Sequence, residues 1–137
     1  FRAEIIGTNF TSTRDEYTLD LTKAYDCPNL KSYTRKFVYD RNGKGSLLVE
    51  DYFELNKAGS FESAVITLAD WQEIGDNKIK LSGKQHTAHI KIEVSSPKGY
   101  TIIPEKIQEN GPEFSRIGIR LNEKSKEGYI RTFFEAE

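Results

Sequence analysis

The chain has 137 residues, which is enough for one domain with a sizeable hydrophobic core and gives no reason to expect a second. Its 20 basic and 21 acidic side chains nearly balance, so the net charge of -1 gives no general reason to expect a nucleic acid or an anionic membrane as partner. No apolar run approaches the ~18 residues of a membrane span, and the first residues lack the pattern of a secretory signal.

The sequence contains no methionine and begins with Phe1, which indicates a piece of a longer protein. Any targeting signal is then expected to have been removed or to lie upstream. The single cysteine, Cys27, cannot form an internal disulfide and says nothing firm about the redox compartment. We therefore expect residues 1–137 to be one domain of a larger multidomain protein.

The N-terminal part of the chain predicts two extended segments. Residues 3–6 are typical of a short edge strand, and residues 8–14 of a polar connection. In residues 17–22 apolar and polar side chains alternate, which is the period-two pattern of a strand. Turn-forming residues at 26–29 end that strand.

Residues 33–39 and 47–55 predict a β-hairpin, because side chains alternate in both segments and an Asn-Gly step between them suits a tight turn. Symmetric pairing about Gly43 places Arg35 opposite Asp51 in an otherwise apolar row. An unpaired charge there would be costly, so we predict a structural ion pair between Arg35 and Asp51. In the alternative, Asp51 lies near the end of the sheet and reaches water.

The rest of the chain continues with short strands and turns. Strands are expected at residues 61–68, 79–81, 88–94, 100–103, 116–121 and 129–134. A turn is expected at residues 56–60, and Pro104 is expected to limit further sheet pairing. Trp71 lies in the irregular stretch 69–77 and is expected to close one end of the core. Eight to ten short strands with turns between them predict an all-β fold, namely a two-layer antiparallel β-sandwich.

Several short motifs resemble those of a known family. Residues 20–25 read Asp-Leu-Thr-Lys-Ala-Tyr, residues 33–39 read Tyr-Thr-Arg-Lys-Phe-Val-Tyr, and residues 48–53 read Leu-Val-Glu-Asp-Tyr-Phe. In this order and spacing they resemble the C-terminal β-domain of heparinase II/III-like polysaccharide lyases. Trp71 and residues 116–119 continue the match more weakly, so that the resemblance covers roughly three quarters of the chain.

The resemblance implies that the chain is the C-terminal domain of a secreted or periplasmic polysaccharide lyase. Lyases of this family abstract the proton α to a uronic-acid carboxylate and eliminate the glycosidic oxygen, using tyrosine and histidine of a helical toroid and a central β-domain. The implied partners are therefore the upstream helical-toroid and central β-domains and an acidic polysaccharide. No residue of this chain matches the family's catalytic motifs, so the domain itself is expected to be inactive and to need no cofactor.

The residues themselves offer no catalytic or metal-binding constellation. His86 and His89 are three positions apart, so on a strand they point to opposite faces and cannot readily share one metal ion. The adjacent carboxylates of Glu50 and Asp51 also face opposite sides and cannot flank a glycosidic bond. No nucleophile elbow and no Gly-rich phosphate loop is present. We predict no catalytic and no metal-binding residue.

Sugar binding is the more serious alternative, because 12% of the residues are aromatic and a planar ring on a sheet surface can stack on a pyranose. A basic strip that would suit an acidic polymer is also conceivable, from Lys78, Lys80, Lys84, His86, His89 and Lys91. The candidate glycan contacts are Tyr52, Trp71, Lys80, His89 and Lys91. In the simpler interpretation, the aromatic side chains belong to the core and the mixed charges to a solvated sheet face.

Two functional hypotheses remain open. In the first, the chain is a non-catalytic C-terminal β-sandwich domain that supports the catalytic domains of a lyase acting on an acidic polysaccharide such as heparin or heparan sulfate. In the second, it is a stand-alone carbohydrate-binding or adhesion module. A third, catalysis by the chain itself, finds no support in the residues.

Overall fold

The computed structural model describes all residues from 1 to 137 and consists of eleven β-strands and one short 3-10 turn. The strands of the first half are β1 (Glu4–Phe10), β2 (Arg14–Asp20), β3 (Leu30–Asp40), β4 (Ser46–Gly59) and β5 (Glu62–Thr67), and the turn η1 (Thr22–Ala24) precedes β3. The second half contains β6 (Asp70–Gly75), β7 (Lys78–Ser82), β8 (Thr87–Val94), β9 (Tyr100–Ile107), β10 (Phe114–Leu121) and β11 (Ser125–Ala136). No helix of the structure has the length and apolar character needed to cross a membrane.

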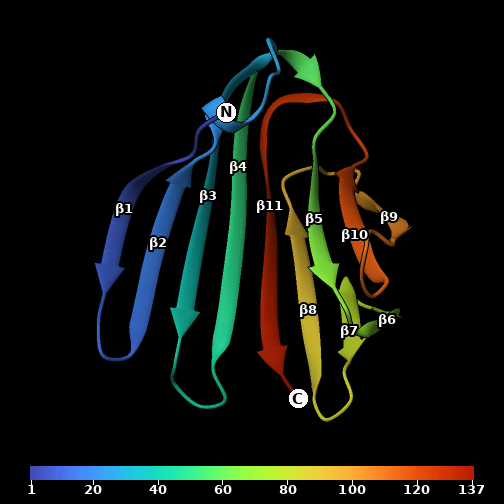
Figure 1. Cartoon of the computed structure of the whole chain (residues 1–137). Coiled ribbons are helices and arrows are strands. Elements are labelled where there is room, and N and C mark those ends of the chain that lie inside the picture. Colours follow the sequence, from blue (N-terminus) through green and yellow to red (C-terminus); the bar gives the residue numbers. More distant parts are fainter.

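The strands form two antiparallel sheets (Figure 1). The large sheet has eight strands in the order β1-β2-β3-β4-β11-β8-β7-β6, and the small sheet has three in the order β5-β10-β9. The predicted all-β, two-layer antiparallel sandwich is confirmed, although the chain forms eleven strands rather than eight to ten.

The hairpin of β3 and β4 has the register that symmetric pairing about Gly43 predicts. Phe37 lies opposite Val49, and Arg35 lies opposite Asp51. Gly43 has a φ of 61° in the connecting loop, a conformation that glycine adopts without the strain of a side chain. The odd-numbered residues of both strands therefore share one face of the large sheet, which we call the inner face because the small sheet packs on it.

Four expectations about element boundaries were wrong. Residues 8–14 are not all a connection, because β1 continues to Phe10 and β2 begins at Arg14. Residues 56–60 are not a turn, because β4 continues to Gly59 and pairs there with Ser125 of β11. The stretch 69–77 is not irregular, because residues 70–75 form β6 at the edge of the large sheet. Pro104 does not end its strand but pairs with Ile117 inside β9. β9 is an edge strand, and an edge tolerates proline because one row of its backbone N–H groups faces solvent.

The hydrophobic core lies between the small sheet and one part of the large sheet. Nine buried residues form it, namely Phe53, Leu55, Ile79, Ile90, Ile92, Ile117, Ile119, Leu121 and Ile130. They come from β4, β7, β8, β10 and β11, and Trp71 of β6 packs against them from the edge. Phe61, which precedes β5, stacks on Phe53 with the ring centroids 4.1 Å apart, so the chain segment that enters the small sheet is anchored on the large one.

The small sheet leaves the other part of the inner face uncovered. No residue of β1 or β2 belongs to the core cluster or packs against it, and in Figure 1 these strands lie away from β5, β9 and β10. Cross-strand pairing places a set of apolar side chains from β1 to β4 on this part. We call it the open face and define it by Ile5, Phe10, Tyr17, Leu19, Phe37, Tyr39, Leu47 and Val49.

Candidate functional site

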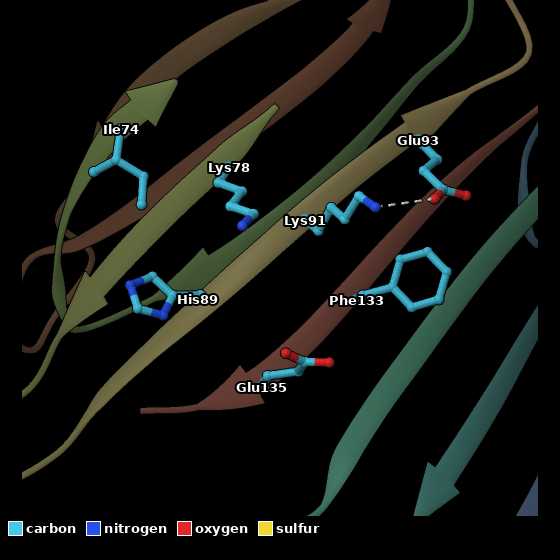
Figure 2. Close-up of a pocket in the computed structure, with 7 residues that line it drawn as sticks. All are labelled: Ile74, Lys78, His89, Lys91, Glu93, Phe133 and Glu135. Carbon is cyan, nitrogen blue, oxygen red and sulfur yellow. Dashed lines mark ion pairs between the residues drawn. The ribbon is translucent and has the colours of Figure 1, made fainter. Parts of the chain in front are cut away.

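A shallow groove lies on the outer face of the large sheet, on the side away from the small sheet (Figure 2). Its volume is about 470 Å³. Seven residues of β6, β7, β8 and β11 line it, namely Ile74, Lys78, His89, Lys91, Glu93, Phe133 and Glu135. The ring of Phe133 forms an apolar patch in its floor, between the charged groups.

The register of β7 and β8 gathers the cations of this groove. Lys78 lies opposite Lys91, and Lys80 lies opposite His89, so all four side chains project from the same face. Like charges that face one another across strands are destabilising unless a counter-charge lies close by. Lys91 has such a partner, because its ammonium group is 3.7 Å from the carboxylate of Glu93.

The groove is nevertheless mixed in charge. Two lysines and two glutamates line it, and Lys78 makes no ion pair within 4 Å although Glu135 lines the same groove. Lys80 lies beside the groove and makes no ion pair either. The free positive charge is therefore confined to the β7 side of the groove, which is a weak basis for binding a long polyanion.

Of the five candidate glycan contacts, the structure brings Lys80, His89 and Lys91 together and leaves the two aromatic residues elsewhere. Trp71 lies opposite Leu81 on the inner face and packs against the core, so it is on the wrong side of the sheet for the groove. Tyr52 is on the outer face of β4, opposite Tyr129, and is 38% exposed. By strand spacing it lies roughly 16 Å from Lys91, because two strand separations and four residues intervene.

Sequence reasoning missed Phe133 as a member of the groove. Its position follows from the pairing of β11 with β8, which sets Phe133 opposite Lys91. The alternation of residues 129–134 predicted the strand but contained no information about its neighbour, since β8 and β11 are far apart in sequence. His86, the other histidine, lies in the exposed connection between β7 and β8.

Charges on the rest of the outer face neutralise one another across strands. The guanidinium of Arg131 pairs with the carboxylate of Glu50, and this hydrogen bond raises the pKa of Arg131. The same guanidinium lies 4.1 Å from the centre of the Tyr129 ring. Lys36 pairs with Glu16 at 3.5 Å. This pattern is that of a solvated sheet face.

On the inner face, a polar network surrounds Asp51 at the border between the core and the open face. Arg35 donates two hydrogen bonds to the carboxylate of Asp51, and Ser63 of β5 donates a third. Arg35 also donates to the hydroxyl oxygen of Tyr33 at 3.1 Å. Asp51 is only 1% exposed and all its neighbours are engaged, so the network has no free group for a reaction.

Tyr33 would have to lose its proton easily to act as a general base, and its surroundings have the opposite effect. Burial raises the pKa of Tyr33 well above the usual range, and the negative charge of Asp51 raises it further. Arg35 opposes both but does not cancel them. The Tyr33 hydroxyl therefore has a structural role in the network.

No group of three or more His, Cys, Asp or Glu side chains converges anywhere in the chain in a way that would hold a metal ion. Cys27 is a free, exposed thiol.

No protein-family model matches the sequence. A search of curated proteins finds no match either.

The fold, in contrast, is shared with solved structures of heparinase III and of the heparan sulfate lyase HepC. A heparinase III structure superposes with a TM-score of 0.70 over 98% of this chain at 12% sequence identity. A mutant of heparan sulfate lyase HepC from Pedobacter heparinus gives a TM-score of 0.72 over 99% of this chain at 14% identity. Another heparinase III gene product gives 0.70 over 96% at 10% identity.

The matched region is a small part of those proteins. The chain spans 21% of the two heparinase III chains and 22% of the HepC chain. At these identities the comparison shows a common fold. It confirms, at the level of the fold, the resemblance that the motifs at residues 20–25, 33–39 and 48–53 indicate.

Proposed function

We propose that the chain is a non-catalytic β-sandwich domain of a heparinase II/III-like polysaccharide lyase and that it supports the catalytic domains of that enzyme. One observation carries the proposal: nearly the whole of this chain, 96% to 99%, superposes on about a fifth of heparinase III and heparan sulfate lyase chains. On this proposal residues 1–137 are a single C-terminal domain of a secreted or periplasmic protein. The remaining domains, a helical toroid and a central β-domain, cleave an acidic polysaccharide such as heparin or heparan sulfate by β-elimination.

The distribution of polar groups agrees with a supporting role. Elimination at a uronic-acid residue needs a base beside the acidic carbon and a positive group beside the carboxylate. In this chain the buried tyrosine, Tyr33, has a raised pKa, and the carboxylate of Asp51 is enclosed by donors. The outer groove has cations and one histidine, but they are exposed to solvent and partly neutralised by Glu93 and Glu135. Neither place combines a poised base with a water-excluding cleft.

A deletion experiment tests the proposal. The longer polypeptide is produced with and without residues 1–137, and this chain is also produced alone. Each is incubated with heparan sulfate, and β-elimination is followed by the ultraviolet absorbance of the unsaturated uronate product. We expect turnover by the longer polypeptide, none by this chain alone, and a lower thermal stability of the catalytic domains after the deletion. Turnover by this chain alone would contradict the proposal, and so would a longer polypeptide that eliminates no uronic-acid polymer.

The second candidate function is a stand-alone carbohydrate-binding or adhesion module. The observation that favours it is the outer groove, where Lys78 and Lys80 have no carboxylate partner and Phe133 offers a ring for stacking. Isothermal titration of this chain with heparin oligosaccharides separates the two functions. A module binds tightly and loses binding in the Lys78→Glu/Lys80→Glu variant, whereas Lys126→Glu, a change at an exposed lysine of β11 outside the groove, leaves binding intact. A supporting domain shows no binding that depends on the groove.

A further inference from the structure

The open face is an exposed apolar surface of the molecule that neither the groove nor the proposed function accounts for. Three of its residues are strongly exposed for apolar side chains: Ile5 is 61%, Phe10 is 64% and Tyr39 is 47% exposed. The others, on β2 to β4, are half-buried. A contiguous apolar patch of this kind on a soluble protein marks an interaction surface.

The open face is an ordered surface and not a scatter of exposed residues. Tyr17, Phe37 and Val49 lie opposite one another across β2, β3 and β4, and the rings of Tyr17 and Phe37 are 6.4 Å apart. The next row consists of Phe10, Asp15, Tyr39 and Leu47 across β1 to β4, so that Asp15 is a charged residue within it. Along each strand these positions are two residues apart, which keeps them on one side.

The opposite side of the same strands shows what a solvated face of this sheet looks like. There Lys36 lies opposite Glu50 and forms an ion pair with Glu16, which lies diagonally across on β2; Val38 and Leu48 form an apolar row on the same side. β2, β3 and β4 therefore carry most of their charged side chains on the outer side, and their more apolar side is turned toward the layer that the small sheet only partly fills. An antiparallel sheet that is apolar on one face is normally covered on that face.

The chemistry of the open face fits a protein surface better than a sugar. The side chains that define it are aliphatic and aromatic, and the charged groups that lie among or beside them are already engaged: Asp15 pairs with Arg41, and Arg35 pairs with Asp51. A glycan needs unengaged hydrogen-bond donors and acceptors, which the apolar side chains of Ile5, Leu19 and Leu47 do not supply. An apolar patch of a neighbouring protein domain needs none.

Two observations indicate that the neighbour belongs to the same polypeptide. The solved proteins that share this fold carry it as only 21% to 22% of their chains, so there it adjoins a much larger remainder. In this chain Phe1 is 97% exposed, and the backbone N–H of Arg2 donates to the carbonyl of Lys23 in η1. The side chain of Tyr25, just after η1, lies 5.6 Å from Tyr33 on the inner face of β3. Residues that precede Phe1 in a longer protein would thus emerge at one end of the open face.

We propose that the open face is the docking surface for a protein domain that precedes Phe1 in the same polypeptide. This inference rests on the proposed function only in taking the chain to be one domain of a longer protein. A covalently joined partner has a high effective concentration, so a modest apolar patch is sufficient to hold it in place. The Arg35 and Asp51 pair lies at the inner border of this surface and fixes the strands that carry it.

Hydroxyl-radical labelling read by mass spectrometry tests the docking surface on the protein with and without its preceding domains. In the isolated chain we expect Phe10, Tyr17 and Tyr39 to be labelled readily. In the longer polypeptide we expect several-fold lower labelling at these three residues and unchanged labelling at Tyr52, which is exposed on the outer face of β4. Equal labelling of the open face in both forms would overturn the inference. Protection that appears only on raising the concentration of the isolated chain would also overturn it, because the occupant would then be a second copy.

A pair of matched variants makes the test independent of labelling efficiency. Tyr39→Glu places a charge on the open face, and Tyr52→Glu places one on the opposite side of the same hairpin. In the longer polypeptide, Tyr39→Glu is expected to raise the labelling of Tyr17 to the level of the isolated chain, whereas Tyr52→Glu leaves it low. If the two variants act alike, the open face is not the contact.

The outcome is separable from that of the proposed function. Protection of the open face in a longer polypeptide that has no lyase activity supports the docking surface and contradicts the function. Lyase activity in a polypeptide whose open face stays labelled contradicts the docking surface alone.

Discussion

Arg35 and Asp51 form a bidentate ion pair across β3 and β4, with the guanidinium Nε 2.6 Å from one carboxylate oxygen and Nη2 2.8 Å from the other. The Asp51 side chain is 1% exposed, whereas that of Arg35 is 28% exposed. Ser63 of the small sheet donates to the same carboxylate. The pair therefore joins the two sheets at the line where the core ends and the open face begins.

Removing one partner of this pair should cost much more than removing both. Arg35→Met leaves a buried carboxylate without its counter-charge, so we expect the free energy of unfolding to fall by about 3 kcal/mol. This loss is at the lower end of the range for breaking a buried ion pair, because Arg35 is partly exposed. Replacing both residues, in Arg35→Met/Asp51→Leu, should restore most of the loss. Urea denaturation of the single and double variants measures the coupling. If the double variant instead lost the sum of the two single-variant losses in the free energy of unfolding, the two charges would not be coupled.

The alkaline stability of the domain should depend on Tyr33. The folded-state pKa of Tyr33 lies above its unfolded value of about 10, because burial and the charge of Asp51 disfavour the phenolate. Above that pH the unfolded chain binds fewer protons than the folded one, so the stability that the neutral hydroxyl contributes is lost as the pH rises toward the folded-state value.

We therefore expect wild-type stability to fall more steeply above pH ~10 than that of Tyr33→Phe, which keeps the ring and removes the titrating group. Denaturation midpoints across the alkaline range measure this slope. Tyr39→Phe is a suitable control because Tyr39 is exposed. Parallel curves for wild type and Tyr33→Phe would contradict the prediction.

Gly128 of β11 leaves room for the ring that anchors the two sheets. A Cβ at this position would lie 3.1 Å from two ring carbons of the buried Phe53 and 2.5 Å from the hydroxyl of Ser95. Gly128→Ala should therefore displace the Phe53 ring from its stack on Phe61 and lower the free energy of unfolding by about 1–3 kcal/mol, the usual cost of overpacking. Gly7→Ala is the matched control, because its Cβ would meet only Thr18, at 3.7 Å. Thermal unfolding that ranks the two variants equally would contradict the prediction.

Glu62 should make the domain sensitive to acid. Burial opposes its ionisation, but hydrogen bonds from Arg116 at 2.6 Å and Arg120 at 2.9 Å outweigh this and hold the pKa of Glu62 below its usual value of 4.5. A lowered folded-state pKa means that the stabilisation is present above the unfolded pKa and is lost as the pH falls through the folded pKa.

The stability difference between wild type and Glu62→Gln should thus be largest above pH ~4.5 and shrink below it. Denaturation at a series of acidic pH values measures the difference. Glu109→Gln, in the exposed loop before β10, should show no such trend. A constant difference across the acidic range would mean that the carboxylate charge of Glu62 is not what stabilises the strands.

Of the candidate glycan contacts, only those on the neighbouring strands β7 and β8 lie together as the sequence predicts. Lys80 and His89 share a face because β7 and β8 pair locally, and the period-two alternation of each strand is visible in the sequence. Trp71 lies on the other side because residues 70–75 form a strand that pairs Trp71 with Leu81, and the local sequence pattern does not predict that strand. Phe133 lies in the groove because β11 pairs with β8, and no local sequence pattern specifies that pairing.

By itself the sequence determined the all-β class, the hairpin of β3 and β4, and the opposition of Arg35 and Asp51 within it. Those features depend on side-chain alternation and on a short turn, which act between residues close in the chain. Only the tertiary structure decided that β4 pairs with β11, that Pro104 lies in an edge strand, and that three strands cover one part of an eight-stranded sheet. Those outcomes depend on which segments far apart in sequence pair and pack against one another. The small sheet has only three strands, so it cannot cover all eight strands of the large sheet, and much of the inner face of β1 to β4 stays uncovered.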